Sequence, residues 1–295
     1  MKFWNLLAFT EDEQLIDAAR HCEEIGFDAI GMSDHLFIPE RIDSHYPGSK
    51  GADGKPFFTI EQLWSFPDPW VALGMIAAST KRVKLMQSIF IMPPRNPIDI
   101  AKATGTLATL APGRLRICPA VGWMKEECDV YGVDFHTRGR RTDEMIAVLR
   151  KLWSGEIVEH QGEFFSFPRL RSLPAPGHIP IIPAGGSEAV MRRAARLGDG
   201  WMDQGNQVAD MPPLIAKLDE MRREAGRDHL PFEVVMVLKD AWDIDLFRRA
   251  EDMGVTAILL LPAFFTLGRR STLDEKKAYW DDFAEKVLRH FPLEG

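Results

Sequence analysis

Two polar residues stand directly after an apolar run near the start of the chain. Residues 27–33 suit a buried β-strand, and Asp34 and His35 follow it. Histidine titrates near neutral pH and can transfer a proton to a substrate or a cofactor. In a parallel barrel the carboxyl end of a strand faces the active site. His35 is therefore a candidate catalytic residue, the alternative being a structural histidine hydrogen-bonded beneath a loop.

A second candidate site lies at the end of the apolar run that begins at Val83. This run contains Ser88 and Ile89, and it ends at two consecutive prolines, which cannot continue a central strand. Asn96 and Pro97 then suit the N-cap and the first turn of a helix. A hydroxyl and a bulky aliphatic side chain at such a strand end could face a planar ring. The alternative is that both belong to the core, as apolar strand residues usually do.

Glycine-containing segments follow two further predicted strands. Gly122 permits a close approach of the backbone, and Trp123 offers either an aromatic wall or ordinary packing. Gly185, Gly186 and Ser187 open a predicted helix, whose N-terminal amides and serine hydroxyl can hold a phosphate. Two glycines alone are a weak signal. Their position at the carboxyl-terminal face of a barrel would strengthen it.

A cluster of charged residues follows, and we interpret it as structural. Arg138, Arg140 and Arg141 precede Asp143 and Glu144, a pattern typical of a solvated helix face with local ion pairs.

Other motifs of chemical interest are weak or missing in the sequence. Residues 51–55 faintly resemble a phosphate loop, but the spacing is wrong and no strand precedes them. No HExxH or other metal-ligand spacing occurs, so no metal site is predicted. No GxSxG elbow occurs, which disfavours a serine hydrolase.

Composition bounds the class of protein. The chain has 295 residues, 45% hydrophobic and 27% charged, with a net charge of −7, which argues against nucleic-acid or membrane partners. Cys22, Cys118 and Cys128 form no CxxC pair and favour a reducing compartment. An acidic N-terminal segment argues against a secretory signal, and the longest uncharged apolar run, residues 255–267, is too short to span a bilayer. We therefore expect a cytoplasmic protein.

The elements that must position these residues alternate between strand and helix. Strands are predicted at 3–9, 27–33, 83–91, 114–120, 181–182, 200–202, 232–238 and 256–261. Helices are predicted from a capping box at Thr10 and Glu13 to Gly26, and at 69–79, 97–110, 124–131, 138–153, 188–197, 212–225, 244–253 and 273–291.

This order predicts an α/β fold with a single domain over residues 1–295. We expect a (β/α)8 TIM barrel with a long loop at 36–68 after the second strand and a hairpin insertion at 157–167 before the fifth. The competing architecture, a doubly wound sheet, usually carries GxGxxG after the first strand, where this chain has Thr10-Glu11-Asp12.

Taken together, these motifs resemble the luciferase-like monooxygenase superfamily, whose members are flavin- or deazaflavin-dependent barrel oxidoreductases. The resemblance covers about residues 26–201. The matching stretches are Ser33-Asp34-His35, Met92-Pro93-Pro94-Arg95-Asn96-Pro97, Gly122-Trp123-Met124-Lys125-Glu126-Glu127, Arg138-Gly139-Arg140-Arg141-Thr142-Asp143-Glu144, Gly162-Glu163-Phe164-Phe165, and Gly185-Gly186 with Arg193-Ala194-Ala195 and Gly198-Asp199-Gly200-Trp201. The Gly-Trp-x-x-Glu-Glu segment and Tyr46-Pro47 are most similar to the branch that uses coenzyme F420.

The resemblance implies roles for particular residues. It implies a cis peptide bond between Ser88 and Ile89, bulging against the cofactor ring, and it places His35 near the reactive edge of that ring. The remaining cofactor-binding residues that we predict are Asp34, Gly122, Trp123, Gly185, Gly186 and Ser187. Sugar-phosphate dehydrogenases of the superfamily carry a glutamate just after the fourth-strand glycine, where this chain has Trp123 and Met124. That departure favours an uncharged or apolar substrate.

Three hypotheses follow. The first is an oxidoreductase that transfers a hydride between F420 and a small uncharged or apolar molecule. The second is an FMN-dependent monooxygenase that uses reduced flavin and O2, with a separate reductase as its partner. The third is a non-catalytic barrel that binds a cofactor without turnover. Family habit also suggests a homodimer.

Overall fold

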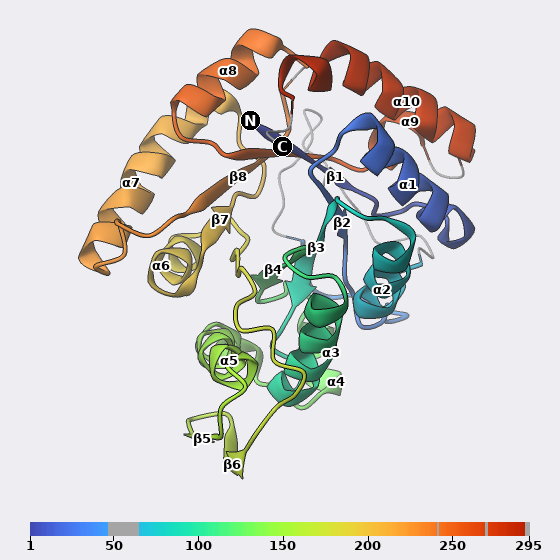
Figure 1. Ribbon diagram of the computed structural model, residues 1–295. Helices are drawn as coiled ribbons and strands as arrows, with labels where there is room; N and C mark the ends of the chain where they lie inside the picture. The colour runs from blue at the N-terminus through green and yellow to red at the C-terminus, as the bar shows by residue number, and fades with distance from the viewer. Residues whose placement is uncertain (47–64, 241, 269–270, 293–295) are drawn as a thin grey trace.

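The computed structural model describes residues 1–46, 65–240, 242–268 and 271–292. Its main feature is a parallel sheet of seven strands in the order β4-β3-β2-β1-β9-β8-β7, which curls into a barrel (Figure 1). The strands are β1 (Lys2–Leu6), β2 (Ala29–Met32), β3 (Lys84–Ile91), β4 (Leu115–Ala120), β7 (Gly200–Met202), β8 (Glu233–Val237) and β9 (Ala257–Leu260). The predicted TIM-barrel fold is thereby confirmed.

The strand predicted at residues 181–182 forms only isolated parallel bridges, Ile117 with Ile181 and Ala184 with Met202. These bridges link β4 to β7 across the gap in the sheet. The amide of Ile117 donates to Pro180 at 3.0 Å, and the amide of Ile182 donates to Ile117 at 2.8 Å. Prolines stand immediately before and after this dipeptide and have no N–H to donate, which limits the pairing.

Helices cover the outside of the barrel (Figure 1). They are α1 (Leu15–Ile25), α2 (Pro69–Ser79), α3 (Pro97–Leu110), α4 (Lys125–Val130), α5 (Arg138–Trp153), α6 (Glu188–Leu197), α7 (Met211–Glu224), α8 (Ile244–Asp252), α9 (Phe264–Leu267) and α10 (Leu273–Lys286). The last predicted helix therefore ends five residues early, and a 3-10 turn at Leu288–His290 follows it.

Local signals at the helix ends were reliable in some places and not in others. Asn96 caps α3 by accepting a hydrogen bond from the amide of Ile98 at 2.8 Å, and Gly26 ends α1 at φ +106°. The capping box predicted at Thr10 is wrong. A 3-10 turn at Asp12–Gln14 precedes α1, and no side-chain cap forms at its start. Phe9 lies at φ +61°, and the amide of Thr10 donates to the Leu7 carbonyl at 3.2 Å, whereas α1 begins only at Leu15.

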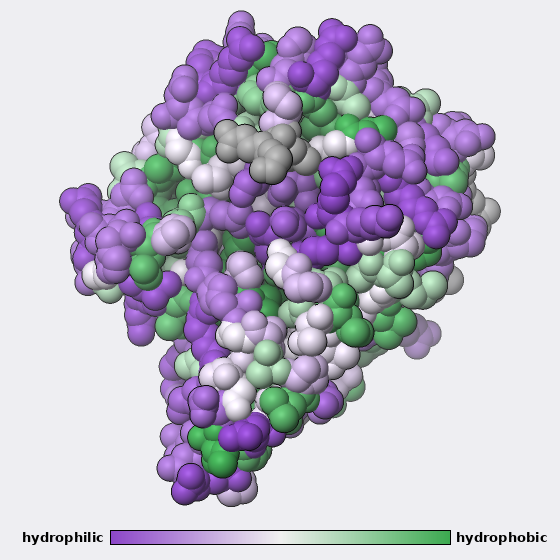
Figure 2. All heavy atoms as spheres, viewed as in Figure 1, coloured by the Kyte–Doolittle hydropathy of each residue, from purple (hydrophilic) through white to green (hydrophobic). Residues whose placement is uncertain are grey.

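Buried apolar side chains form two layers. One lies between the strands and the helices and contains Phe3, Trp153 and Trp280 among many others. The second fills the barrel interior; its buried members are Trp4, Ala29, Met86, Cys118, Ile182, Ala184, Met202, Val235, Ala257 and Leu259. Hydrophilic residues are prominent on the outer face over α1, α8 and α10, as Figure 2 shows. The interior layer provides a floor on which a ligand site can rest.

The two predicted insertions differ in how much of them is described. The hairpin consists of β5 (Val158–Gln161) and β6 (Ser166–Leu170), which form a separate antiparallel sheet beyond α5 (Figure 1). The described parts of the long loop, 36–46 and 65–68, contain no helix or strand. Residues 51–55 lie outside the described part of the chain. Within the described ranges, no helix combines the length and apolar character needed to cross a bilayer.

Candidate active site

A cavity of about 590 Å³ opens at the carboxyl ends of the barrel strands. All the residues that the sequence predicted for the site line it: Asp34, His35, Ser88, Ile89, Gly122, Trp123, Gly185, Gly186 and Ser187. Its volume falls within the usual range for small-molecule sites. Leu6, Ile89 and Val237 line the cavity and pack on the interior core layer, so that layer forms the cavity floor.

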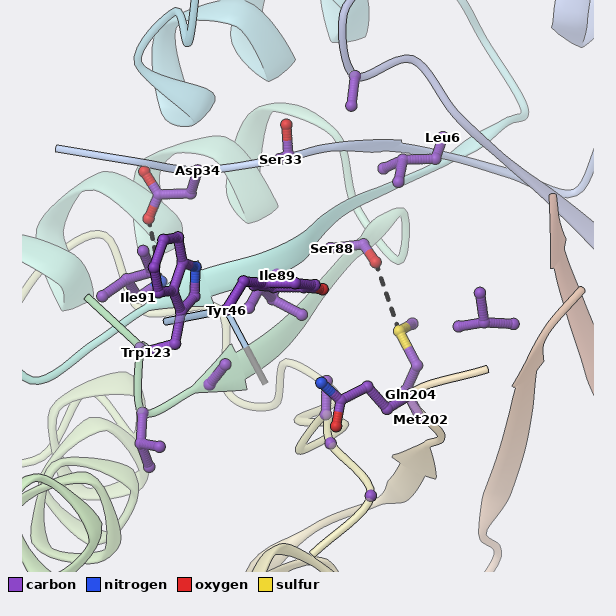
Figure 3. A pocket seen from close by; sticks show the side chains of 18 of the residues that line it. Leu6, Ser33, Asp34, Tyr46, Ser88, Ile89, Ile91, Trp123, Met202 and Gln204 are labelled. Carbon is purple, nitrogen blue, oxygen red and sulfur yellow. Dashed lines mark hydrogen bonds between the residues drawn. The ribbon is translucent and has the colours of Figure 1, made fainter. Parts of the chain in front are cut away.

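The backbone of β3 is irregular where it borders the cavity. The peptide bond between Ser88 and Ile89 is cis, as the resemblance implied. Pairing with β4 shifts register between Ser88 and Phe90, which leaves Ile89 as a bulge. The Ser88 hydroxyl donates a hydrogen bond to Met202 Sδ at 3.3 Å (Figure 3). The bulge therefore presents Ile89 to the cavity, and the hydrogen bond from Ser88 to Met202 connects the bulge to β7.

Asp34 fixes the strand just beyond this bulge. Its Oδ2 accepts a hydrogen bond from the amide of Ile91 at 3.0 Å (Figure 3). Its Oδ1 accepts one from Arg95 Nη2 at 2.6 Å. Arg95 in turn donates to the Ile91 carbonyl at 3.2 Å. Burial raises the pKa of Asp34 to about 6, against the opposing effects of Arg95 and the Ile91 amide. Asp34 and Arg95 thus clamp both polar groups of Ile91.

His35 is held between aromatic rings and a buried carboxylate. Its ring meets Phe66 edge-on at 4.9 Å between centroids and Trp123 at 6.1 Å. Its Nδ1 lies 3.2 Å from Glu127 Oε1, which also accepts a hydrogen bond from the Leu36 amide at 2.8 Å. The Glu127 side chain is 1% exposed. The imidazole therefore has a fixed orientation at the cavity wall.

Trp123 and Tyr46 form one side of the cavity. Their rings meet edge-on with centroids 5.4 Å apart, and Figure 3 shows Trp123, Tyr46 and Ile89 lying close together. Tyr46 also shares a hydrogen bond with Gln204, and burial raises the pKa of its phenol. Gly122 lies at φ +75°, and an added Cβ would come within 3.1 Å of Ile91. Glycine is therefore the residue that lets the backbone turn beside the clamped strand.

The segment after Ala184 brings glycines and a helix start to the opposite side. Gly185 lies at φ +140°, and its carbonyl accepts a hydrogen bond from Trp201 Nε1 at 2.9 Å. Ser187 is the N-cap of α6, a helix of ten residues. Ser187 accepts a hydrogen bond from the Val190 amide at 3.4 Å, and within the described residues no partner is found for the amides of Glu188 and Ala189, so this end can receive an anion.

Arg138 supplies a positive charge that the sequence interpretation missed. It lines the cavity at the start of α5, donates to the Phe135 carbonyl at 2.7 Å, and lies over the Phe135 ring at 3.6 Å. Burial lowers its pKa. Arg193, in the middle of α6, donates to the Gly139 carbonyl at 3.0 Å, which packs α6 against the start of α5.

The interpretation of this cluster as a solvated face with local ion pairs is wrong. Arg141 donates to the Pro93 carbonyl at 2.7 Å, Asp143 pairs with Arg193, and Glu144 lies 3.0 Å from His160. Each partner belongs to another element, because the N-terminal half of α5 is covered by the loop after β3, by α6 and by the hairpin.

The remaining wall is largely apolar. Phe9, Phe66 and Phe265 line it, and their rings meet edge-on, with Phe9 5.8 Å from Phe66 and 6.0 Å from Phe265. Leu259, Leu261 and Pro262 continue this surface. Asp203, Gln204 and Lys239 add polar groups to the lining. An aromatic compartment thus lies in the same cavity as His35.

Comparison with known proteins places this geometry in a family. Residues 10–243 match the luciferase-like monooxygenase family. The chain belongs to the luciferase-like monooxygenase family. An uncharacterised protein of Mycobacterium tuberculosis is 32% identical over 98% of this chain and 99% of its own length. The F420-dependent glucose-6-phosphate dehydrogenase of Kineococcus radiotolerans is 31% identical over 85% of this chain and 70% of its own length.

Solved structures share the fold. An F420-dependent secondary alcohol dehydrogenase, determined with an F420-acetone adduct, superposes with a TM-score of 0.76 over 97% of this chain and 98% of its own, at 18% identity. The relatives of this chain in the luciferase-like family therefore include an F420-dependent enzyme, the glucose-6-phosphate dehydrogenase named above.

Glu127 is the site residue of this luciferase-like protein that sequence reasoning left without a role. It appeared only as part of a matching stretch, and its contact with His35 joins positions 92 residues apart. The signal available in the sequence was an acidic residue in the first turn of a short predicted helix, four residues after Trp123. Its partner could not be identified without the fold.

Proposed function

We propose that the protein is an oxidoreductase that transfers a hydride between coenzyme F420 and an uncharged or apolar organic molecule. The observation that carries this proposal is the single cavity that combines the bulge at Ile89, the imidazole of His35 and the anion-receptive start of α6. Membership of a family with F420-dependent relatives supports the choice of cofactor.

The phosphate end of the cofactor would lie at the starts of α5 and α6. An added Cβ on Gly186 would come within 3.5 Å of Gln204, so a side chain there would narrow the cradle. The amides after Gly185 and the hydroxyl of Ser187 can donate hydrogen bonds, and Arg138 adds a charge-assisted donor. These residues fit a phosphate-bearing group.

The ring end would lie against the bulge. Ile89 offers an apolar surface beneath it, and Trp123 bounds the cavity beside it. When bound, the deazaflavin would accept or supply the hydride. The clamp of Asp34 and Arg95 on Ile91 keeps this surface in place, and the interior core beneath the cavity excludes water.

His35 would accept or donate a proton at a substrate oxygen. Its ring is held by Glu127 at one nitrogen and lines the cavity that would contain the substrate. Phe66 beside it and the other phenylalanines provide an apolar surface for the rest of the substrate. This lining favours an uncharged molecule with at least one polar group.

The test is a binding comparison. We expect F420 to bind with micromolar affinity and FMN to bind more weakly in fluorescence titrations. Arg138→Gln should weaken F420 about tenfold or more, because a charge-assisted hydrogen bond to phosphate is lost. The same variant should bind the phosphate-free deazaflavin alcohol as the wild type does. Arg140→Gln serves as the control. It removes an exposed arginine of the same helix, α5, that pairs with Glu163 of the hairpin and does not line the cavity.

The rival function is an FMN-dependent monooxygenase, which the family description favours. The same ring seat and phosphate cradle would serve FMN. Oxygen consumption with reduced FMN, at a rate above that of the free flavin, would support the rival. Preferential binding of FMN over F420 would overturn the F420 proposal and direct attention to a partner reductase.

A further inference from the structure

Behind the cavity wall, in contact with the lining residue His35, lies a buried acidic residue to which neither family membership nor the proposed function gives a role. Glu127 lies in the first turn of α4, with a side chain that is 1% exposed. A buried carboxylate is costly unless its oxygens are hydrogen-bonded. Its Oε1 meets both His35 Nδ1 and the Leu36 amide, at 3.2 and 2.8 Å. Its Oε2 is buried and has no hydrogen-bond partner among the described residues.

In the hydrogen bond between His35 and Glu127, the imidazole must be the donor. A carboxylate oxygen can only accept a hydrogen bond, so Nδ1 must carry a proton for the contact to stabilise the pair. A neutral imidazole with its proton on Nδ1 has an unprotonated Nε2. No described residue bonds Nε2. That nitrogen is thus left to accept a proton from a ligand in the cavity that His35 lines.

The neighbouring residue, Glu126, bonds backbone amides and not His35, so its variants can serve as controls for those of Glu127. Glu126 Oε1 accepts hydrogen bonds from the amides of Asp43 and Ser44, at 2.7 and 3.0 Å. Burial opposes its ionisation, but these hydrogen bonds and one from the Ser44 side chain hold the pKa of Glu126 at about 2. It anchors the segment that ends at Tyr46 and is not bonded to His35.

We propose that Glu127 is a positioning residue that fixes the tautomer and the orientation of His35. Of the two neutral tautomers it selects the one with Nδ1 protonated, so that Nε2 of the neutral ring meets the substrate as a proton acceptor. The inference rests on the proposed function for its catalytic consequence. The tautomer itself is a property of the protein alone.

The two glutamates allow a clean set of variants. Glu127→Gln can keep its Oε1 in place, so both hydrogen bonds persist while the negative charge is lost. Glu127→Leu removes both bonds at similar volume. Glu126→Leu releases the backbone at 43–44 without touching the imidazole and is the matched control. His35→Gln identifies the His35 signals among those of the eight histidines.

The primary readout is the nitrogen chemical shift of the His35 ring in ¹⁵N-histidine-labelled full-length protein at pH 8. We expect Nδ1–H in the wild type, in Glu127→Gln and in Glu126→Leu. We expect Glu127→Leu to gain the Nε2–H form that predominates in free histidine. An Nε2–H signal in the wild type, or an unchanged tautomer in Glu127→Leu, would overturn the proposal.

The second readout is turnover. Once a substrate is found, we expect kcat to fall about tenfold or more in Glu127→Leu and to be largely retained in Glu127→Gln, with KM little changed. Equal losses in both variants would show that charge, not hydrogen bonding, is what matters, and would overturn the positioning role. If the protein binds F420 but turns nothing over, the proposed function fails, and the tautomer measurement still decides this inference.

Discussion

Replacing Asp34 with asparagine should remove a loss of stability that the wild type suffers as pH rises, because burial raises the pKa of this carboxyl group. The carboxyl group is 1% exposed, and three titratable side chains face it: Arg95 from the loop after β3, Glu127 from α4 and His35 from its own strand end. Desolvation and Glu127 raise its pKa, whereas Arg95 and His35 lower it, and the pKa of the folded state is about 6 against 3.8 for the free group. This difference corresponds to about 3 kcal/mol.

The sign follows from proton binding. Between about pH 4 and pH 6 the folded chain holds a proton on Asp34 that the unfolded chain has already released. Stability contributed by this group is therefore present at low pH and falls as pH rises through the window. Asparagine cannot titrate. The free energy of unfolding of Asp34→Asn, minus that of the wild type, should accordingly rise by about 2–3 kcal/mol from pH 4 to pH 7.

The assay is urea unfolding of both proteins at half-unit intervals from pH 4 to 7. Taking the difference cancels the acidic groups with lowered pKa values, such as Glu126, that both proteins share. Asp129→Asn is the control, since it removes an exposed carboxylate paired with Lys125 and should change the difference by less than about 0.5 kcal/mol. A difference for Asp34→Asn that is flat or falls with pH would refute the reasoning.

Two further substitutions test a glycine at the cavity and a buried ion pair away from it. Gly122→Ala should lower the free energy of unfolding more than Gly132→Ala does, as measured by urea unfolding. Both glycines have positive φ, so each alanine costs about 1–2 kcal/mol, but only the new Cβ at position 122 would also press on Ile91. Equal losses in the two variants would argue against the contact. Lys276→Met should lower stability by about 2–4 kcal/mol, since the 2% exposed lysine pairs with Glu11 at 2.6 Å, and an unchanged unfolding midpoint would contradict that role.

The barrel and its cavity were largely predictable from local signals. Helices α2, α3 and α6 begin and end where the sequence placed them, because Asp68, Asn96 and Ser187 each accept a capping hydrogen bond from the first turn. Residues that follow apolar strands converge at one barrel face by topology alone. That rule brought His35 and Ser88 into one cavity without any knowledge of their contacts.

What could not be predicted depends on contacts between distant segments. Arg138 was assigned to a solvated face because neighbouring charges along the chain suggested local pairs, while the fold packs it against Gly122 and Phe135. Glu127 gained its role only through a residue 92 positions earlier. The capping box at Thr10 is absent because a 3-10 turn at Asp12–Gln14 precedes α1, so the helix begins at Leu15 and not beside Thr10.

The proline-flanked bridges at Ile181 and Ala184 give the barrel a seam where backbone pairing is sparse. The seam lies between β4 and β7, and the proposed phosphate cradle is formed by Arg138 of α5 and Ser187 of α6, which line the cavity. A ligand bound by residues of both α5 and α6 would connect the two sides of the seam and stabilise it. Amide protons near Ile182 should consequently exchange faster than those of β1 in the free protein, and occupancy of the cradle should slow them.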